Sequence, residues 1–127
     1  MPSQKILVID DEYDNAFILK SGLERKGGYN VDLFTDPFAA LNDFRANSYD
    51  LIMIDVRMPN MNGFDLYKKI KERDNNVKIC FLSASDNTYE EFKKCHPTLE
   101  EKCFIKKPVT LSELVDRIKQ FLAGRYG

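Results

Sequence analysis

Four short apolar runs in the chain each end in a charged or hydroxylated residue. The runs cover 6–9, 51–54, 79–82 and 103–105, and they lead into Asp10-Asp11-Glu12, Asp55, Ser83 and Lys106-Lys107-Pro108. Continuous apolar runs of this length are typical of strands buried on both faces of a parallel sheet. In such a sheet the ligand crevice lies beyond the carboxyl ends of the strands. We therefore expect three carboxylates, a hydroxyl and an ammonium to converge in one crevice.

Helical patterns alternate with these runs along the chain. Asp36-Pro37 is typical of a helix start, Gly27-Gly28 of a helix end, and Thr110 with Glu113 of a capping box. The pattern predicts strands over 5–10, 31–34, 51–54, 77–82 and 103–105, and helices over 14–26, 36 to about 47, 63–73, 88 to about 94 and after Thr110. This alternation predicts an α/β fold, a doubly wound sandwich of four or five parallel strands with helices on both faces.

Composition limits the function classes. The 127 residues match one domain over 1–127, with a core of about 4–123, and 19 basic against 20 acidic residues give a net charge of −1. This balance provides no electrostatic footprint for nucleic acid or a membrane surface. We see no signal peptide and no run near the ~18 apolar residues of a membrane span, so we expect a soluble, cytoplasmic protein.

The residue types in the crevice indicate their chemistry. Asp10, Asp11 and Asp55 would repel one another without a cation, and hard oxygen ligands without a nearby His or Cys favour Mg²⁺ over zinc. The three cysteines form no Cys-x-x-Cys, so neither a zinc knuckle nor a disulfide framework is indicated. Ser83 and one lysine could bind a phosphoryl oxygen, and we favour Lys107 over Lys106 because it directly precedes a proline.

Here the chain resembles a known family, the receiver domains of two-component response regulators. The resemblance covers essentially all of the chain. It rests on the pair Asp10-Asp11, the D-x-x-M-P-x-M-x-G segment from Asp55 to Gly63, Ser83-Ala84 and Lys107-Pro108. It implies a flavodoxin-like three-layer sandwich with five helices and a five-stranded parallel sheet in the order 2-1-3-4-5.

The resemblance also implies roles for single residues. Asp55 would be the phosphoacceptor, and Mg²⁺ would be bound directly by Asp11 and Asp55, through water by Asp10 and by the backbone carbonyl of Arg57. Around the phosphoryl group, Ser83 and Lys107 would bind it, Ala84 would leave it space, Phe104 would be the switch aromatic, and the bond before Pro108 would be cis.

A signalling role follows from the same resemblance. A sensor histidine kinase or a phosphotransfer protein would donate the phosphoryl group, and slow self-hydrolysis would remove it. The change would remodel the surface of the helix at 88–94, the strand at 103–105 and the last helix, which would control an unidentified protein target. The chain would be a monomer or a phosphorylation-dependent dimer rather than a multiple-turnover enzyme.

One segment departs from the family pattern. The stretch between Ser83 and Lys107 is longer than in most relatives, and residues 95–102 are atypical, with Pro97 expected to end the preceding helix. His96, the one histidine, lacks companions for metal binding or phosphotransfer, so we expect a capping or surface role. The partner contacts of relatives on this face therefore cannot be carried over.

Three other function classes compete with the leading hypothesis. A phosphatase with an aspartyl-phosphate intermediate typically needs a general acid two residues after the nucleophile, where this chain has Arg57. A nucleotide or flavin module would need a glycine-rich loop after the first strand instead of Asp10-Asp11-Glu12. A phosphorylation-independent binding module on the same fold remains the main alternative.

Overall fold

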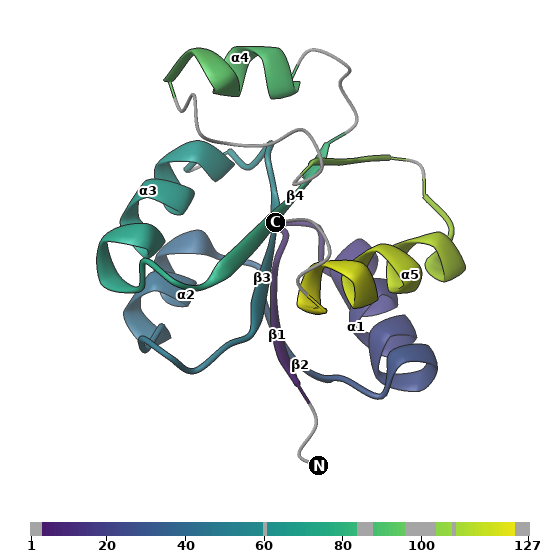
Figure 1. Ribbon diagram of the computed structural model, residues 1–127. Coiled ribbons are helices and arrows are strands. Elements are labelled where there is room, and N and C mark those ends of the chain that lie inside the picture. Colours follow the sequence, from purple (N-terminus) through teal and green to yellow (C-terminus); the bar gives the residue numbers. More distant parts are fainter. Residues whose placement is uncertain (1–3, 60, 84–87, 96–103, 108, 124–127) are drawn as a thin grey trace.

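The computed structural model describes residues 4–59, 61–83, 88–95, 104–107 and 109–123. Their strands form one parallel sheet in the order β2-β1-β3-β4-β5 (Figure 1). The strands are β1 (Lys5–Ile9), β2 (Asn30–Phe34), β3 (Leu51–Asp55), β4 (Lys78–Ser83) and β5 (Phe104–Lys106). The fold class and the strand order that the sequence predicts are therefore confirmed.

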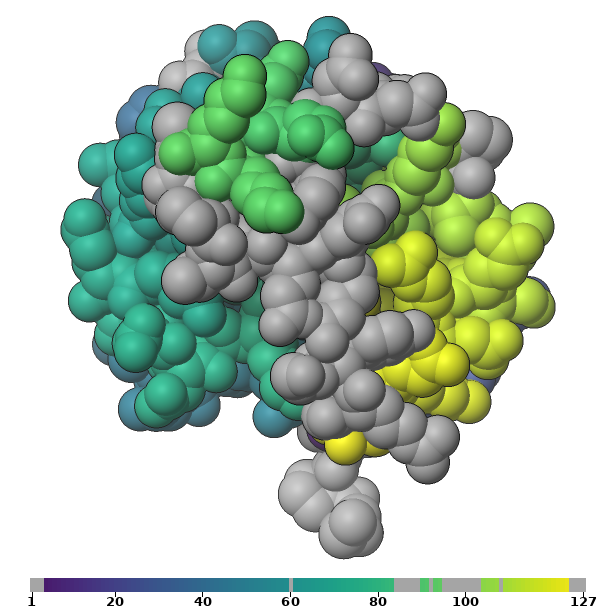
Figure 2. Space-filling model, turned by 45° about the horizontal axis from the view of Figure 1, so that its top comes forward, coloured from purple at the N-terminus to yellow at the C-terminus, as the bar shows by residue number. Residues whose placement is uncertain are grey.

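Helices cover both faces of this sheet. They are α1 (Tyr13–Gly27), α2 (Pro37–Asp43), α3 (Gly63–Arg73), α4 (Thr88–Cys95) and α5 (Leu111–Leu122). α2 and α3 pack on one face and α1 and α5 on the other, while α4 lies at the top of the view, beyond the end of β4 (Figure 1). With the top of the molecule tilted towards the viewer, the surfaces of α3 and α5 lie on opposite sides of α4 (Figure 2).

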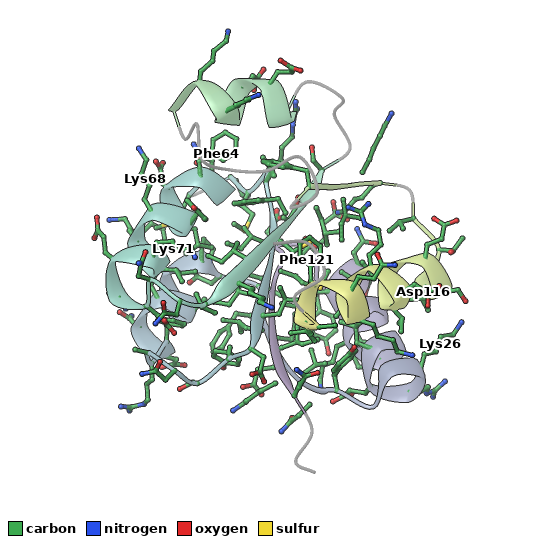
Figure 3. All side chains as sticks on the ribbon, viewed as in Figure 1. Lys26, Phe64, Lys68, Lys71, Asp116 and Phe121 are labelled. Atoms are coloured by element: carbon green, nitrogen blue, oxygen red, sulfur yellow. The ribbon has the colours of Figure 1, made fainter. Side chains whose placement is uncertain are left out.

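The core has two halves separated by the sheet. Successive residues of β1 point to opposite faces, so Ile6 and Val8 pack with α1 and α5, whereas Leu7 and Ile9 pack with α2 and α3. Phe121 closes the first half from α5, where it lies between the helix and the sheet (Figure 3). Burial on both faces explains why the central strands read as continuous apolar runs rather than as alternating ones.

Local signals fix several helix ends. Asp36 precedes α2, and its Oδ1 accepts a hydrogen bond of 2.9 Å from the Phe38 N–H, with Pro37 at the first helical position. Thr110 Oγ1 accepts a hydrogen bond of 3.1 Å from the Glu113 N–H at the start of α5. Gly28 ends α1 in the left-handed conformation, with φ of 69°, which a residue without a Cβ adopts at little cost.

The predicted end of α2 near Asn47 is wrong. The helix ends at Asp43, and Phe44 turns extended, which buries its ring in the core. Asn47 then has φ of 66° and donates its N–H to Asp74 Oδ2 at 2.9 Å. Long-range packing and a long-range hydrogen bond therefore decide this boundary, and neither is visible in the local sequence.

Candidate functional site

The site lies where β1 and β3 end side by side. Asp10 follows β1 and Asp55 is the last residue of β3. The chain leaves β1 for α1 on one face of the sheet and leaves β3 for α3 on the other, which makes this gap the topological switch point. The loops are held by hydrogen bonds that continue beyond the strands, since the Asp10 N–H donates to Phe34 O at 3.1 Å and the Val56 N–H to Leu82 O at 3.1 Å.

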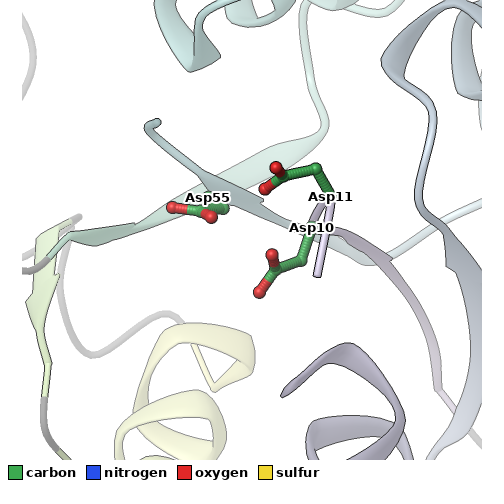
Figure 4. A group of neighbouring side chains, drawn as sticks. All are labelled: Asp10, Asp11 and Asp55. Atoms are coloured by element: carbon green, nitrogen blue, oxygen red, sulfur yellow. The ribbon is translucent and has the colours of Figure 1, made fainter. Parts of the chain in front are cut away.

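Three carboxylates meet in this gap, as the sequence predicts. One oxygen from each of Asp10, Asp11 and Asp55 can be chosen so that all lie within 4.8 Å of one another (Figure 4). Asp10 is buried and Asp55 is partly buried, whereas Asp11 lies nearer to solvent. Carboxylates this close repel one another unless a cation is present, and burial strengthens the repulsion.

The surroundings of Asp10 suit a cation. Its Oδ1 accepts a hydrogen bond of 3.0 Å from the Glu12 N–H. Its Oδ2 is buried and has no hydrogen-bond donor among the described residues; the Lys107 Nζ lies 3.8 Å away. A buried carboxylate oxygen without a donor is costly, and hard oxygen ligands suit a divalent cation such as Mg²⁺.

The pKa of Asp55 is also consistent with a cation bound in this gap. Burial raises the pKa of Asp55 to about 6, and the Asp10 carboxylate adds to this increase. The Lys107 ammonium and the Arg57 N–H, which donates to Asp55 Oδ1 at 3.3 Å, act in the opposite direction and lower that pKa. A pKa raised in a cleft beside a specific charge partner is a common property of functional carboxylates.

The hydroxyl and the ammonium come from the next two strands. Ser83 ends β4 and is buried, and its carbonyl accepts a hydrogen bond of 2.8 Å from the Lys107 N–H. Lys107 follows β5, and its ammonium turns towards Asp10, whereas Lys106 is exposed. Ala84 and Pro108 lie outside the described residues, so the open space and the cis bond expected there stay predictions.

Gly63 contributes to the site in a way that the sequence does not reveal. Its N–H donates to Val56 O at 3.0 Å, so α3 starts directly against the loop that follows Asp55. A Cβ on Gly63 would lie 3.0 Å from Val56 Cα and 3.1 Å from Asp55 O. Glycine therefore serves close backbone approach here, and the only signal in the sequence is a glycine opening a helix after the motif.

Phe104 belongs to an aromatic group on the α3 side of the sheet. Its ring stacks on Phe81 with centroids 5.0 Å apart, and Phe81 in turn meets Tyr67 at 5.5 Å and Phe64 edge-on at 6.3 Å. Phe64 lies at the start of α3, on the side towards α4 (Figure 3). The group connects β5 to the helix that begins beside Asp55, and the role of Phe104 as a switch aromatic stays a prediction.

Fold and site together define a doubly wound α/β protein with three clustered carboxylates at its switch point. The family model described as the response regulator receiver domain matches residues 6–119. The chain therefore belongs to the response regulator receiver domain family.

Individual relatives agree with this assignment. The chain is 30% identical over 119 residues to the transcriptional regulatory protein PcoR of Escherichia coli, covering 94% of this chain and 51% of PcoR. It is 38% identical over 117 residues to the sensor protein EvgS of Escherichia coli (strain K12), covering 91% of this chain and 9% of EvgS. The chain thus spans about half the length of PcoR and a small part of EvgS.

Solved structures agree as well. The non-phosphorylated HemR receiver domain from Leptospira biflexa superposes with a TM-score of 0.82 at 30% identity, covering 95% of both chains.

Within the part of the chain that the structure describes, no helix is long and apolar enough to cross a membrane.

Proposed function

We propose that this chain accepts a phosphoryl group on Asp55 from the phosphohistidine of a sensor histidine kinase or a phosphotransfer protein, in a reaction that needs Mg²⁺. The observation that carries the proposal is the meeting of Asp10, Asp11 and Asp55 within 4.8 Å, with the Lys107 ammonium beside them, in a member of the receiver family. Phosphoryl transfer needs little more than positioning and neutralisation of charge, and this group of residues supplies both.

In the proposed metal site, carboxylate oxygens of Asp11 and Asp55 and the backbone carbonyl of Arg57 would hold Mg²⁺, and Asp10 would help through water. A bound Mg²⁺ would neutralise charge on the phosphoryl oxygens and favour the ionised form of Asp55, which is the form that attacks phosphorus. The buried Asp10 Oδ2, which lacks a hydrogen-bond donor among the described residues, supports this assignment because it would gain a compensating charge.

In the transfer step an Asp55 oxygen forms a bond to phosphorus. The nitrogen–phosphorus bond of the phosphohistidine breaks, and its electron pair stays on the imidazole. Lys107 pairs with the transferred group as a point charge, and the Ser83 hydroxyl donates a hydrogen bond to one of its oxygens. Water later attacks the phosphorus atom, the bond from phosphorus to the Asp55 oxygen breaks, and inorganic phosphate leaves. The chain is therefore a slow self-phosphatase rather than a multiple-turnover enzyme.

The signal would leave through the surface formed by α4, β5 and α5. A new charge of about −1.5 to −2 at Asp55 draws Ser83 towards it and makes room for Phe104 to rotate. Rotation would break the stack of Phe104 on Phe81 and so change the packing beside β5. A protein partner or a second copy of the chain would then bind the altered surface.

The test is the intact mass of the protein after incubation with acetyl phosphate, with and without Mg²⁺. We expect the wild type to gain one hydroxylamine-labile phosphoryl group only when Mg²⁺ is present. Asp55→Asn should gain none, whereas the control Asp43→Asn, which changes an exposed carboxylate on α2, should behave as wild type. A wild type that gains no phosphoryl group, or an Asp55→Asn that gains one, would refute the proposal and favour a binding module independent of phosphorylation.

A further inference from the structure

An apolar pocket lies next to the candidate site. It has a volume of about 450 Å³, and it is lined by Asn15, Ile18 and Leu19 of α1, Leu82 of β4, Lys107, and Val109 and Leu111 around the start of α5. Small-molecule sites in proteins typically measure ~300–1,000 Å³ and combine apolar walls with a few polar groups. By size and chemistry this pocket therefore suits a small ligand with an apolar part.

A small residue lies where α1 meets a side chain that lines the pocket. Gly22 of α1 faces Leu111, and a Cβ on Gly22 would lie 2.5 Å from a Leu111 methyl carbon. This close approach holds Leu111, at the start of α5, against α1. Ile18, which also lines the pocket, is 56% exposed, which is high for a large aliphatic side chain.

Lys107 joins the pocket to the phosphorylation site. The same side chain lines the pocket and places its ammonium 3.8 Å from Asp10 Oδ2. Because Lys107 is the cation in the described part of the lining, a fitting ligand carries an anionic group at the Lys107 end and an apolar group among Ile18, Leu19 and Leu111. The charge and the apolar surface thus select an amphipathic anion.

We propose that this pocket binds the acyl group of small-molecule acyl phosphates, so that donors with a longer apolar chain phosphorylate Asp55 faster than acetyl phosphate does. This inference rests on the proposed function of Asp55. The phosphoryl group would lie between Asp55 and Lys107, and in-line displacement places the leaving group on the side of phosphorus away from Asp55. An acyl chain of four carbons can then turn past Lys107 into the pocket.

The step balances without a further reactant. An Asp55 oxygen forms a bond to phosphorus, and the bond from phosphorus to the acyl oxygen breaks. The electron pair stays on that oxygen, and the product leaves as a carboxylate anion. A buried methylene favours binding by ~0.8 kcal/mol, about fourfold, so two methylenes in an open pocket should accelerate the reaction roughly fivefold.

The experiment compares n-butyryl phosphate with acetyl phosphate as donors at equal Mg²⁺, with the second-order rate constant for modification of Asp55 followed by intact mass. The two leaving carboxylates have nearly equal basicity, so intrinsic reactivity does not favour either donor. We expect a butyryl-to-acetyl rate ratio of about 5 for the wild type. The ratio should fall to about 1 for Ile18→Asn and remain about 5 for Phe38→Asn, which changes a residue that is also half-exposed but lies on α2.

Two failures are distinguishable. Modification by neither donor would refute the proposed function itself. Modification by both donors at equal rates would leave that function intact and overturn the pocket proposal, leaving the pocket to a protein partner. Val109→Thr provides a second variant of nearly the same shape; it should lower the ratio without affecting the fold, which circular dichroism checks.

Discussion

The two edges of the sheet each bury a carboxylate, and the two are treated in opposite ways. At the carboxyl edge, Asp10 is 1% exposed, and its Oδ2 has no hydrogen-bond donor within the described residues. At the amino edge, Asp74 is 7% exposed, and it accepts hydrogen bonds from the Asn47 N–H at 2.9 Å and the Asn76 N–H at 3.1 Å. The same residue type therefore meets a full set of donors at one edge and an incomplete set at the other.

The pKa values follow this difference. The backbone N–H of Asn47 lowers the pKa of Asp74, and the N–H of Asn76 adds to the effect against the cost of burial. Beside Asp10, burial raises the pKa of Asp55 to about 6. The amino edge thus uses its carboxylate to join two loops, while the carboxyl edge holds clustered carboxylates whose repulsion the proposed cation would relieve.

The largest effect should come from truncation at the amino edge. Asp74→Ala removes the acceptor of two partly buried backbone N–H groups, so it should lower the free energy of unfolding by about 3 kcal/mol. Urea denaturation measures the change. Asp74→Asn keeps one acceptor oxygen and should lose less than half as much; equal losses for the two variants would contradict the hydrogen-bond explanation.

Magnesium should stabilise the opposite edge. Mg²⁺ at a concentration of ten times its dissociation constant should raise the free energy of unfolding by about 1.4 kcal/mol, because only the folded chain brings the three carboxylates together. Thermal unfolding with and without Mg²⁺ measures this stabilisation. Asp11→Asn should abolish it, whereas Asp74→Asn should start from a lower stability and keep the full increase. A loss of the increase in Asp74→Asn would show that the two edges are coupled.

The sequence predicts the carboxyl edge better than the amino edge, for a physical reason. Asp10 and Asp55 follow apolar strands, and the ends of parallel strands must meet, so their convergence can be inferred without coordinates. Asp74 receives its main donor from Asn47, which lies 27 positions away in a turn with positive φ. That contact depends on where α2 ends, which the local pattern predicts wrongly.

Inside the site, too, the sequence does not predict features that depend on packing between distant segments. The strands fall within about a residue of their predicted bounds because burial on both faces leaves a continuous apolar signal. The lack of a donor for Asp10 Oδ2, the close approach at Gly63 and the pocket beside Lys107 depend on how neighbouring elements pack. The residue types in the sequence therefore indicate the chemistry, and packing decides how strongly each group is perturbed.

The two edges should respond to pH with opposite signs. The pKa of Asp55 in the folded chain, about 6, lies above its ordinary value of 3.8, so this group makes the metal-free protein less stable as pH rises from about 4 through 6. The pKa of Asp74 is lowered, so its contribution is present above its ordinary value of 3.8 and is lost as pH falls below it.

Asp55→Asn isolates the Asp55 effect. At pH 7.5 without Mg²⁺ it should be more stable than wild type by about 1 kcal/mol, a figure reduced for solvent screening of a partly exposed carboxylate. The difference should shrink as pH falls to 4, where Asp55 of the folded chain is neutral, as Asn is, and urea denaturation across this range measures it. A difference in stability that does not change with pH would mean that folding does not raise the pKa of Asp55.

The smallest effect should come from an exposed acid at the amino edge. Asp50 Oδ2 accepts a hydrogen bond of 2.8 Å from the Lys5 N–H, and the Asp50 N–H donates to Lys5 O at 2.8 Å. Because Asp50 is exposed, water can replace its carboxylate as the acceptor, so Asp50→Ala should cost only about 0.5 kcal/mol. Urea denaturation beside Asp74→Ala gives the comparison. A cost equal to that of Asp74→Ala would show that the number of hydrogen bonds, rather than burial of the acceptor, determines the stability of this edge. A small cost would show that burial of the acceptor explains the difference between the Asp50 and Asp74 variants. Burial is also what separates Asp10 from the exposed carboxylates of the chain.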